Sequence, residues 1–248
     1  MGKQETIARI WGIPLLWLSC LIIATFSFPY FEEIFRQIEP NQRQVIYSRD
    51  SFFSLLLNHL SLVGIAAIIS ILLGVSSAIF VTRPYGKDFL PLVSQIASMG
   101  QTFPPIAVLA LSVPLLGFGA LPTILALSLY GLLPIVRNTL AGIQGVDAAV
   151  IESARGMGMS SFQVLRQVEL PLASTVILSG IRTSVTINIA TAAIGSTIGA
   201  STLGDPVISG LVNGNTAYVI QGAILIGLLA LSTDSLLDRL QLRLGARR

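Results

Sequence analysis

Long apolar runs recur along almost the whole chain, and they constrain its fold more than any other feature. An α-helix needs about 20 apolar residues to cross the hydrocarbon core of a bilayer. Only 11% of the residues are charged, whereas a soluble domain carries about 25%, and the mean hydropathy is +0.79. The sequence therefore predicts an all-α polytopic membrane protein with about six transmembrane helices, at Trp11–Pro29, Leu60–Thr82, Leu90–Gly117, Leu121–Val136, Thr183–Ala200 and Tyr218–Ser232.

The third run, Leu90–Gly117, is too long for one regular span and contains the adjacent prolines Pro104 and Pro105. Proline lacks a backbone N–H and disrupts the helical turn that precedes it. Such a break is tolerated at membrane depth only where protein or a water-filled cavity receives the freed backbone groups. We therefore expect the third span to be broken there.

Lysines and arginines are distributed unevenly between the connections of the predicted spans. If the N-terminus is cytoplasmic, 12 of the 15 lie inside, and only Arg36, Arg43 and Arg49 lie outside. Because cytoplasmic connections carry an excess of basic residues, we expect both termini, and residues 147–171, in the cytoplasm. The pI near 9.4 does not indicate nucleic-acid binding, since the basic residues flank apolar runs instead of forming one patch.

Within these bounds the predicted spans contain no Asp, Glu, Lys or His. His59 is expected as an interfacial residue just before the second span, and Arg182 at the cytoplasmic boundary of the fifth. A metal site needs three or four ligands, and the single cysteine, Cys20, supports neither a disulfide nor a thiol cluster. The sequence therefore predicts neither a catalytic nor a metal site.

Two features that the sequence lacks limit how this chain could use energy for transport. Proton-driven carriers keep Asp, Glu or His within their spans to take up the coupled ion. The chain has no G-x-x-x-x-G-K-[ST] phosphate-binding loop either. The sequence therefore favours neither proton coupling nor ATP hydrolysis on this chain.

Residues 147–171 form a charged segment between apolar runs, and their pattern predicts a short amphipathic helix, a turn and a second short helix. Asp147 is suited to cap the first helix. The apolar face of this helix is predicted to consist of Val150, Ile151 and Ala154. Gly156 and Gly158 then provide the backbone freedom for a turn.

The second helix is predicted to begin at Ser160, which has the capping-box spacing with Gln163. Its expected apolar stripe is Phe162, Leu165 and Val168. Pro171 is tolerated where a helix begins, so we expect it to mark the start of the next element.

This segment resembles the cytoplasmic signature of the permease subunits of bacterial ATP-binding cassette (ABC) importers, which runs E-A-A, three residues, Gly, nine residues, Ile, one residue, Leu-Pro. The residues that match are Glu152, Ala154, Gly158, Leu170 and Pro171, whereas Ser153 and Val168 replace an Ala and the Ile. The resemblance implies the type I importer permease fold and a coupling loop that docks into the ATPase subunit. A connector that is merely amphipathic is the alternative.

Two further segments, GQTFPPIAVLALSVPLLGFG from Gly100 and ASTLGDPVISGLVNGNTAYVIQGA from Ala200, look like the permeases of Gram-negative bacteria that import glycine betaine, choline and related osmoprotectants. The resemblance implies a permease core at 60–238 in a multi-pass protein of the bacterial inner membrane. Residues 1–59 then form an N-terminal span with an external segment, and residues 239–248 a cytoplasmic tail. The alternatives are an importer of amino acids or other small polar solutes, a channel and a membrane scaffold.

The same resemblance implies partners and a translocation path. The expected partners are two ATPase subunits that hold ATP and Mg, a second permease that is identical or homologous, and a periplasmic binding protein. Candidate residues on the path are Gln101, Thr102, Phe103, Tyr130 and Asn188. Aromatic faces recognise quaternary ammonium groups, although the polar residues could equally bond between helices and the aromatic ones face lipid or pack in the bundle.

Overall fold

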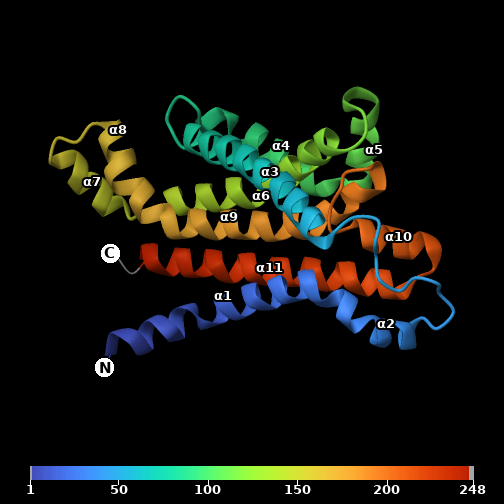
Figure 1. Cartoon of the computed structure of the whole chain (residues 1–248). Helices are drawn as coiled ribbons and strands as arrows, with labels where there is room; N and C mark the ends of the chain where they lie inside the picture. Colours follow the sequence, from blue (N-terminus) through green and yellow to red (C-terminus); the bar gives the residue numbers. More distant parts are fainter. Residues whose placement is uncertain (1, 246–248) are drawn as a thin grey trace.

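The computed structural model describes the backbone of residues 2–245 and the side chains of residues 11–243, and all regular structure in this part of the chain is helical (Figure 1). The predicted fold class is therefore confirmed. The long helices are α1 (Gly2–Ser27), α3 (Phe52–Val81), α6 (Ala120–Gln144), α9 (Leu170–Ala192) and α11 (Thr216–Gly245). The shorter ones are α2 (Glu32–Ile38), α4 (Leu90–Thr102), α5 (Pro105–Leu116), α7 (Ala148–Gly156), α8 (Ser161–Val164) and α10 (Asp205–Asn213).

The long helices run between two ends of an elongated bundle (Figure 1). One end, which we call the α7–α8 end, also holds the start of α1 and the last turns of α11. The other, the α10 end, holds α2 and α10. This arrangement agrees with the prediction that both termini lie on the same side as residues 147–171, while the side of the membrane itself stays a prediction.

Among the residues that the structure describes, five helical segments are long and apolar enough to cross a membrane, and α4 with α5 makes a sixth if the bent pair counts as one span. Their axes meet at 101°, because α4 ends at Thr102 and α5 begins at Pro105. Between them Phe103 is extended, as is favoured before a proline. The predicted break is confirmed.

The helix α3 begins at Phe52, not near Leu60, because the Ser51 side chain caps it by accepting from the Ser54 N–H at 3.1 Å. His59 therefore lies inside the helix and is 0% exposed. Its Nε2 lies 3.0 Å from the Ile189 carbonyl, and the Leu203 N–H donates to Nδ1 at 3.3 Å. The prediction of an interfacial histidine was wrong, because the ring joins three buried segments.

The helix α6 does not end near Val136 but continues past Pro134 and Arg137 to Gln144. Pro134 cannot donate to the Tyr130 carbonyl four residues earlier. The side-chain amide of Gln101 donates to that carbonyl instead, at 3.1 Å. A contact from α4 thus compensates for the proline in α6.

Arg182 lies in the middle of α9 and not at its boundary, and α11 continues well past Ser232. The Arg182 guanidinium donates to both carboxylate oxygens of Asp234 at 2.6 Å and also pairs with Asp238. Because these acidic residues on α11 compensate the charge, α9 passes through Arg182 without a break. Helices α3, α9 and α11 thus carry ionisable side chains that the shorter predicted spans excluded.

Candidate functional site

The first helix of segment 147–171 forms as its sequence predicts. The Asp147 side chain accepts from the Ala149 N–H at 2.9 Å and so caps α7. Ala154 is buried with 2% exposure and Glu152 is exposed. Val150 departs from the prediction, since it is 42% exposed and leaves Ala154 as the buried residue of that face.

Gly158, and not Gly156, provides the reversal after α7. The Gly158 N–H donates to Arg155 O at 2.9 Å and the Met159 N–H to Ala154 O at 3.2 Å. This is a Schellman motif, whose C′ residue is left-handed, and Gly158 has a φ of +82°. Gly156 stays helical as the last residue of α7. The signature glycine thus occupies the one position of this turn at which a Cβ atom would be strained.

The predicted capping box is confirmed at the start of α8. The Gln163 N–H donates to Ser160 Oγ at 3.3 Å, and the Ser160 N–H donates to Gln163 Oε1 at 2.8 Å. Two backbone donors that a helix start leaves free are satisfied reciprocally. The start of α8 is therefore defined by side chains only three residues apart.

The helix α8 continues without interruption into α9 through one π-helical turn, η3 (Leu165–Glu169). In that turn the Leu170 N–H donates to the Leu165 carbonyl, five residues earlier. Pro171 has no N–H, and its ring would clash with the carbonyl four residues earlier in a regular helix. A π turn places Pro171 at the first turn of α9 without a break in the helix. Pro171 therefore marks the start of the next element, as predicted, although α8 and α9 are continuous.

The π turn also changes which side chains face inward. Phe162 is 67% exposed, whereas Val164 is buried at 2% and Glu169 at 5%. Leu165 and Val168 are half-buried. The predicted stripe of Phe162, Leu165 and Val168 assumed a regular 3.6-residue period, and residues with that spacing no longer share a face across a π turn.

Glu169 pairs with Arg83, the first basic residue after α3, and the sequence analysis missed this contact. Their side chains are 7% and 14% exposed, and Arg83 Nη2 lies 2.6 Å from Glu169 Oε2. A charge this deeply buried requires a partner. The pair therefore fixes the α3–α4 connection against the start of α9. The two residues are 86 positions apart in the sequence, so no local pattern predicts their contact.

A cavity of about 600 Å³ opens between the α3–α4 connection and α8. Basic and aromatic side chains line much of it, including Arg83, Tyr85, Lys87, Arg155 and Phe162. The α7–α8 end thus presents a concave surface beside the exposed residues of α7 and α8. We call α7, α8 and η3 together the coupling segment.

The structure brings three of the candidate path residues together where α4–α5 meets α6. The Gln101 side chain donates to Tyr130 O, and the Tyr130 hydroxyl donates to Phe103 O. Thr102 only donates to Ser98 O of its own helix, at 2.9 Å. Within the described chain these contacts secure the broken span against α6.

Asn188 lies apart from these residues, between α9 and α6, and is 0% exposed. In the part of the chain that the structure describes, neither polar atom of its amide has a hydrogen-bond partner, and the same holds for Ser184 Oγ nearby. A Cβ atom on Gly131 of α6 would lie 3.1 Å from Asn188 Nδ2 and 2.6 Å from Ser184 Oγ. Asn188 could contact a solute only if α6 and α9 moved relative to each other.

Within residues 11–243, whose side chains the structure describes, no group of three or more His, Cys, Asp or Glu residues is arranged to hold a metal ion. Four charged side chains at the α7–α8 end line the cavity described above, namely Arg83, Lys87, Arg155 and Glu169.

Residues 70–246 match the protein family described as "Binding-protein-dependent transport system inner membrane component". The chain is 46% identical over 179 residues to the osmoprotectant import permease protein OsmY of Salmonella typhimurium, which covers 72% of this chain and 76% of that protein. It is 43% identical over 187 residues to the carnitine transport permease protein OpuCB of Listeria monocytogenes, covering 75% and 84%. It is 41% identical over 179 residues to the choline transport system permease protein OpuBB of Bacillus subtilis, covering 72% and 82%.

Solved structures share the fold. An inward-facing structure of the MetNI methionine ABC transporter matches with a TM-score of 0.70 at 20% identity, over 77% of this chain and 95% of that one. An amino acid ABC transporter with histidines matches with a TM-score of 0.65 at 24% identity, over 77% and 92%. At these identities the likeness establishes the architecture and not the cargo.

Proposed function

The chain belongs to the family of binding-protein-dependent transport system inner membrane components, and from that membership we propose that it is the permease subunit through which an ATP-driven importer moves a small osmoprotectant into the cytoplasm. The cargo class follows from the names of its relatives, which are permeases for osmoprotectants, carnitine and choline. These relatives are 41–46% identical, whereas the amino-acid transporters are 20–24% identical. The likeness in sequence therefore favours a quaternary ammonium cargo such as glycine betaine or choline over an amino acid.

The observation that carries the proposal is the construction of the coupling segment. Its helices are capped, its signature glycine forms the Schellman turn, and its α8 continues into α9 as one helix. Glu152 and Phe162 are exposed beside the cavity at this end. We infer that an ATPase subunit docks here and that ATP and Mg are bound on that subunit.

The contacts of this segment suggest how an ATPase movement reaches the membrane helices. A displacement of α8 would pass directly into α9, because η3 joins the two without a break. The buried pair of Arg83 with Glu169 would carry the same displacement to α3. Since α6 packs between α3 and α9, we infer that ATP-driven closure shifts these three helices together and so alternates access to the path.

The remaining partners complete the proposal. A periplasmic binding protein would deliver the cargo at the α10 end, and a second permease, identical or homologous, would supply the other half of the path. Gln101, Thr102, Phe103, Tyr130 and Asn188 stay candidates for contacts with the cargo. The coupling segment would then lie in the cytoplasm, as the distribution of basic residues predicts.

Uptake of radiolabelled glycine betaine into proteoliposomes tests this function. The vesicles hold the whole complex, with ATP on the side of the coupling segment and the binding protein on the other. We expect uptake that requires ATP and continues when a protonophore collapses the proton gradient, because the acidic residues Asp234, Asp238 and Glu169 within the helices are paired with arginines. Uptake that stops with the protonophore while ATP is present would refute the energy source. No uptake of any quaternary ammonium compound would refute the cargo.

A further inference from the structure

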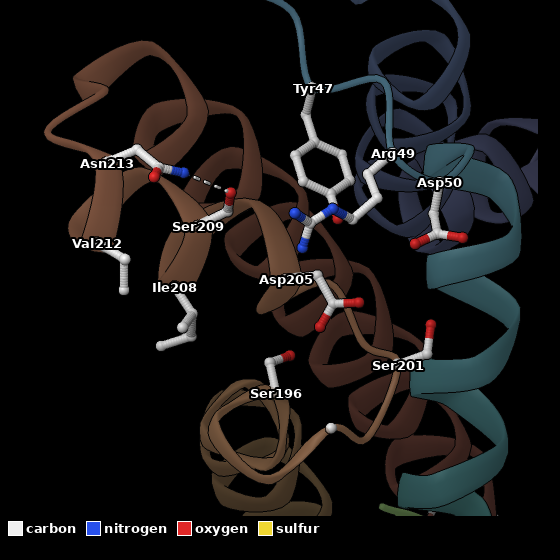
Figure 2. A pocket seen from close by; sticks show the side chains of 11 residues that line it. Tyr47, Arg49, Asp50, Ser196, Ser201, Asp205, Ile208, Ser209, Val212 and Asn213 are labelled. Carbon is white, nitrogen blue, oxygen red and sulfur yellow. Dashed lines mark hydrogen bonds between the residues drawn. The ribbon is translucent and has the colours of Figure 1, made fainter.

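A second cavity, of about 550 Å³, lies at the α10 end, far from the coupling segment. Its wall combines residues just before α3 with the helix η4 (Ala193–Ile198), the following loop and α10. Figure 2 shows side chains from all of these segments directed around one open space. Its volume falls in the range of small-molecule sites, which is roughly 300–1,000 Å³.

Asp205, the first residue of α10, supplies a negative charge to this cavity. It is half-buried between Ser196 and Ser201 (Figure 2). Burial raises the pKa of the Asp205 carboxyl, with a smaller contribution from Asp50, while hydrogen bonds from Ser196 and Thr202 act in the opposite direction. The carboxylate is thus partly desolvated, and a cation that entered the cavity would stabilise its charged form.

Arg49 supplies the opposite charge from the other side of the cavity, where it is exposed. Among the residues that the structure describes, Arg49 forms no ion pair within 4.0 Å with Asp50 or with Asp205. The segment that carries it is fixed, because the Tyr47 N–H donates to Gln221 Oε1 at 3.1 Å and Gln221 Nε2 donates to Val45 O at 2.6 Å. One cavity therefore presents separated charges of both signs.

Tyr47 closes the same cavity with an aromatic ring that is 5% exposed. The ring packs edge-on against Tyr218 at 5.5 Å between centroids. Burial, and then the charge of Asp205, raises the pKa of Tyr47 to about 12. The phenol is therefore neutral at physiological pH and adds an aromatic wall without adding a charge.

We propose that this cavity is an outer binding site of the permease for a small quaternary ammonium zwitterion, with Asp205 facing the ammonium group and Arg49 binding the carboxylate. The inference rests on the proposed function and names the residues that receive the cargo at the α10 end. A zwitterion satisfies both charges at once. Its trimethylammonium group has no N–H, so a carboxylate attracts it by charge alone, and aromatic faces attract it as they do other cations. Choline, which has no carboxylate, would not use Arg49.

The test measures direct binding to the permease–ATPase complex in lipid nanodiscs, with the binding protein omitted. Saturation-transfer NMR detects the methyl protons of glycine betaine or choline at the weak affinities expected of a transit site. We expect Asp205→Asn to weaken both ligands on the order of tenfold, because the half-buried negative charge that attracts the ammonium group is lost. Arg49→Gln should weaken glycine betaine about fivefold, as loss of an exposed charge pair does, and more than it weakens choline.

The matched control is Arg43→Gln. Arg43 is also exposed and in the same external segment, but it lines a neighbouring groove instead of this cavity. The Arg43→Gln complex should bind glycine betaine and choline as tightly as the unaltered complex does. Because Arg49 is exposed, its variant tests the proposal even if Asp205→Asn fails to fold.

Three outcomes overturn the proposal. One is the absence of a saturation-transfer signal in the unaltered complex, and another is equal binding by all three variants. In the third, Arg49→Gln reduces uptake in the presence of the binding protein but leaves glycine betaine binding in nanodiscs unchanged. That result would make the cavity a docking surface for the binding protein. If the unaltered complex imports glycine betaine but the variants bind normally, only this site fails, whereas no import at all refutes the proposed function.

Discussion

The two ends of the molecule handle charge in opposite ways. At the α7–α8 end Arg83 and Glu169 are buried and paired with each other. At the α10 end Arg49 and Asp205 line one cavity, and in the described chain they form no ion pair with each other. A paired, buried charge fixes two segments together, whereas charges held apart beside open space are available to a ligand. The difference is consistent with the two proposals made above, in which the α7–α8 end transmits movement and the α10 end receives a solute.

The two ends also differ in what holds their backbone. The coupling segment is stabilised by local contacts, such as the capping box of Ser160 with Gln163. The external segment before α3 is held from the start of α11 instead. There the Thr216 N–H donates to Glu39 Oε1 at 2.8 Å, and Asn215 Nδ2 donates to Gln44 O at 2.9 Å. A segment fixed by distant contacts depends on the assembled bundle for its shape.

The largest expected effect concerns the sides of the membrane on which the two ends lie. In a Cys20→Ser background, a cysteine at Asn213 should react with an impermeant thiol reagent in intact cells, whereas one at Ser161 should not. Both positions are exposed, so a difference reports sidedness and not burial. Mass spectrometry of the purified protein measures the labelling, and reaction at Ser161 alone would invert the orientation.

Next in size is the removal of the buried pair at the α7–α8 end. Glu169→Ala leaves the Arg83 charge buried without its partner, which costs about 3–5 kcal/mol of stability. We expect a lower thermal midpoint of the complex and uptake reduced more than tenfold. Glu152→Ala makes the same substitution at an exposed residue and should leave the midpoint unchanged.

The double variant Arg83→Met with Glu169→Met separates stability from coupling. Two apolar side chains restore much of the stability, because no charge is left buried. If the pair transmits movement, uptake per ATP hydrolysed should stay low in this variant. A double variant with normal coupling would show that the pair only stabilises the fold.

A smaller effect is expected at the glycine turn of the coupling segment. Gly158→Leu places a side chain at a φ of +82°, which costs about 1–2 kcal/mol, and should reduce the amount of ATPase that co-purifies. Gly156→Leu is the matched control, because Gly156 is helical and a Cβ atom there meets nothing within 4 Å. Equal loss of the ATPase in both variants would contradict the specific role of Gly158.

The smallest effect is a pH dependence at the α10 end. Because burial raises the pKa of Asp205, its carboxylate takes up a proton at a higher pH than an ordinary aspartate does. Binding of glycine betaine in nanodiscs should therefore decline as the pH falls toward that pKa. The stability of the fold changes in the opposite direction. Because the pKa is raised, the folded state binds the proton more tightly than the unfolded state, and protonation favours folding.

Asp205→Asn is the control for this pH dependence, and its weaker binding should vary less with pH. Asp50, which also faces the cavity, keeps its carboxylate in this variant. A profile that stays as steep without Asp205 would assign the titration to another group.

The sequence by itself determined the helical class, the break before Pro105, the capping residues Asp147 and Ser160, and the turn at Gly158. The contacts that form these features join groups only a few residues apart. Apolar length and local hydrogen bonds follow directly from the order of residues, so they can be deduced before the chain is folded.

The tertiary structure alone decided how the ionisable and polar residues inside the helices are satisfied. Arg182 meets Asp234 52 residues away, Gln101 reaches the Tyr130 carbonyl 29 residues away, and Arg83 reaches Glu169. The predicted spans begin too late at α3 and α9 and end too early at α6, because the predicted bounds stop beside His59, Arg182 and Arg137. A buried or half-buried polar side chain is acceptable within a helix when a distant segment supplies its partner, and only packing of the whole bundle brings such partners together.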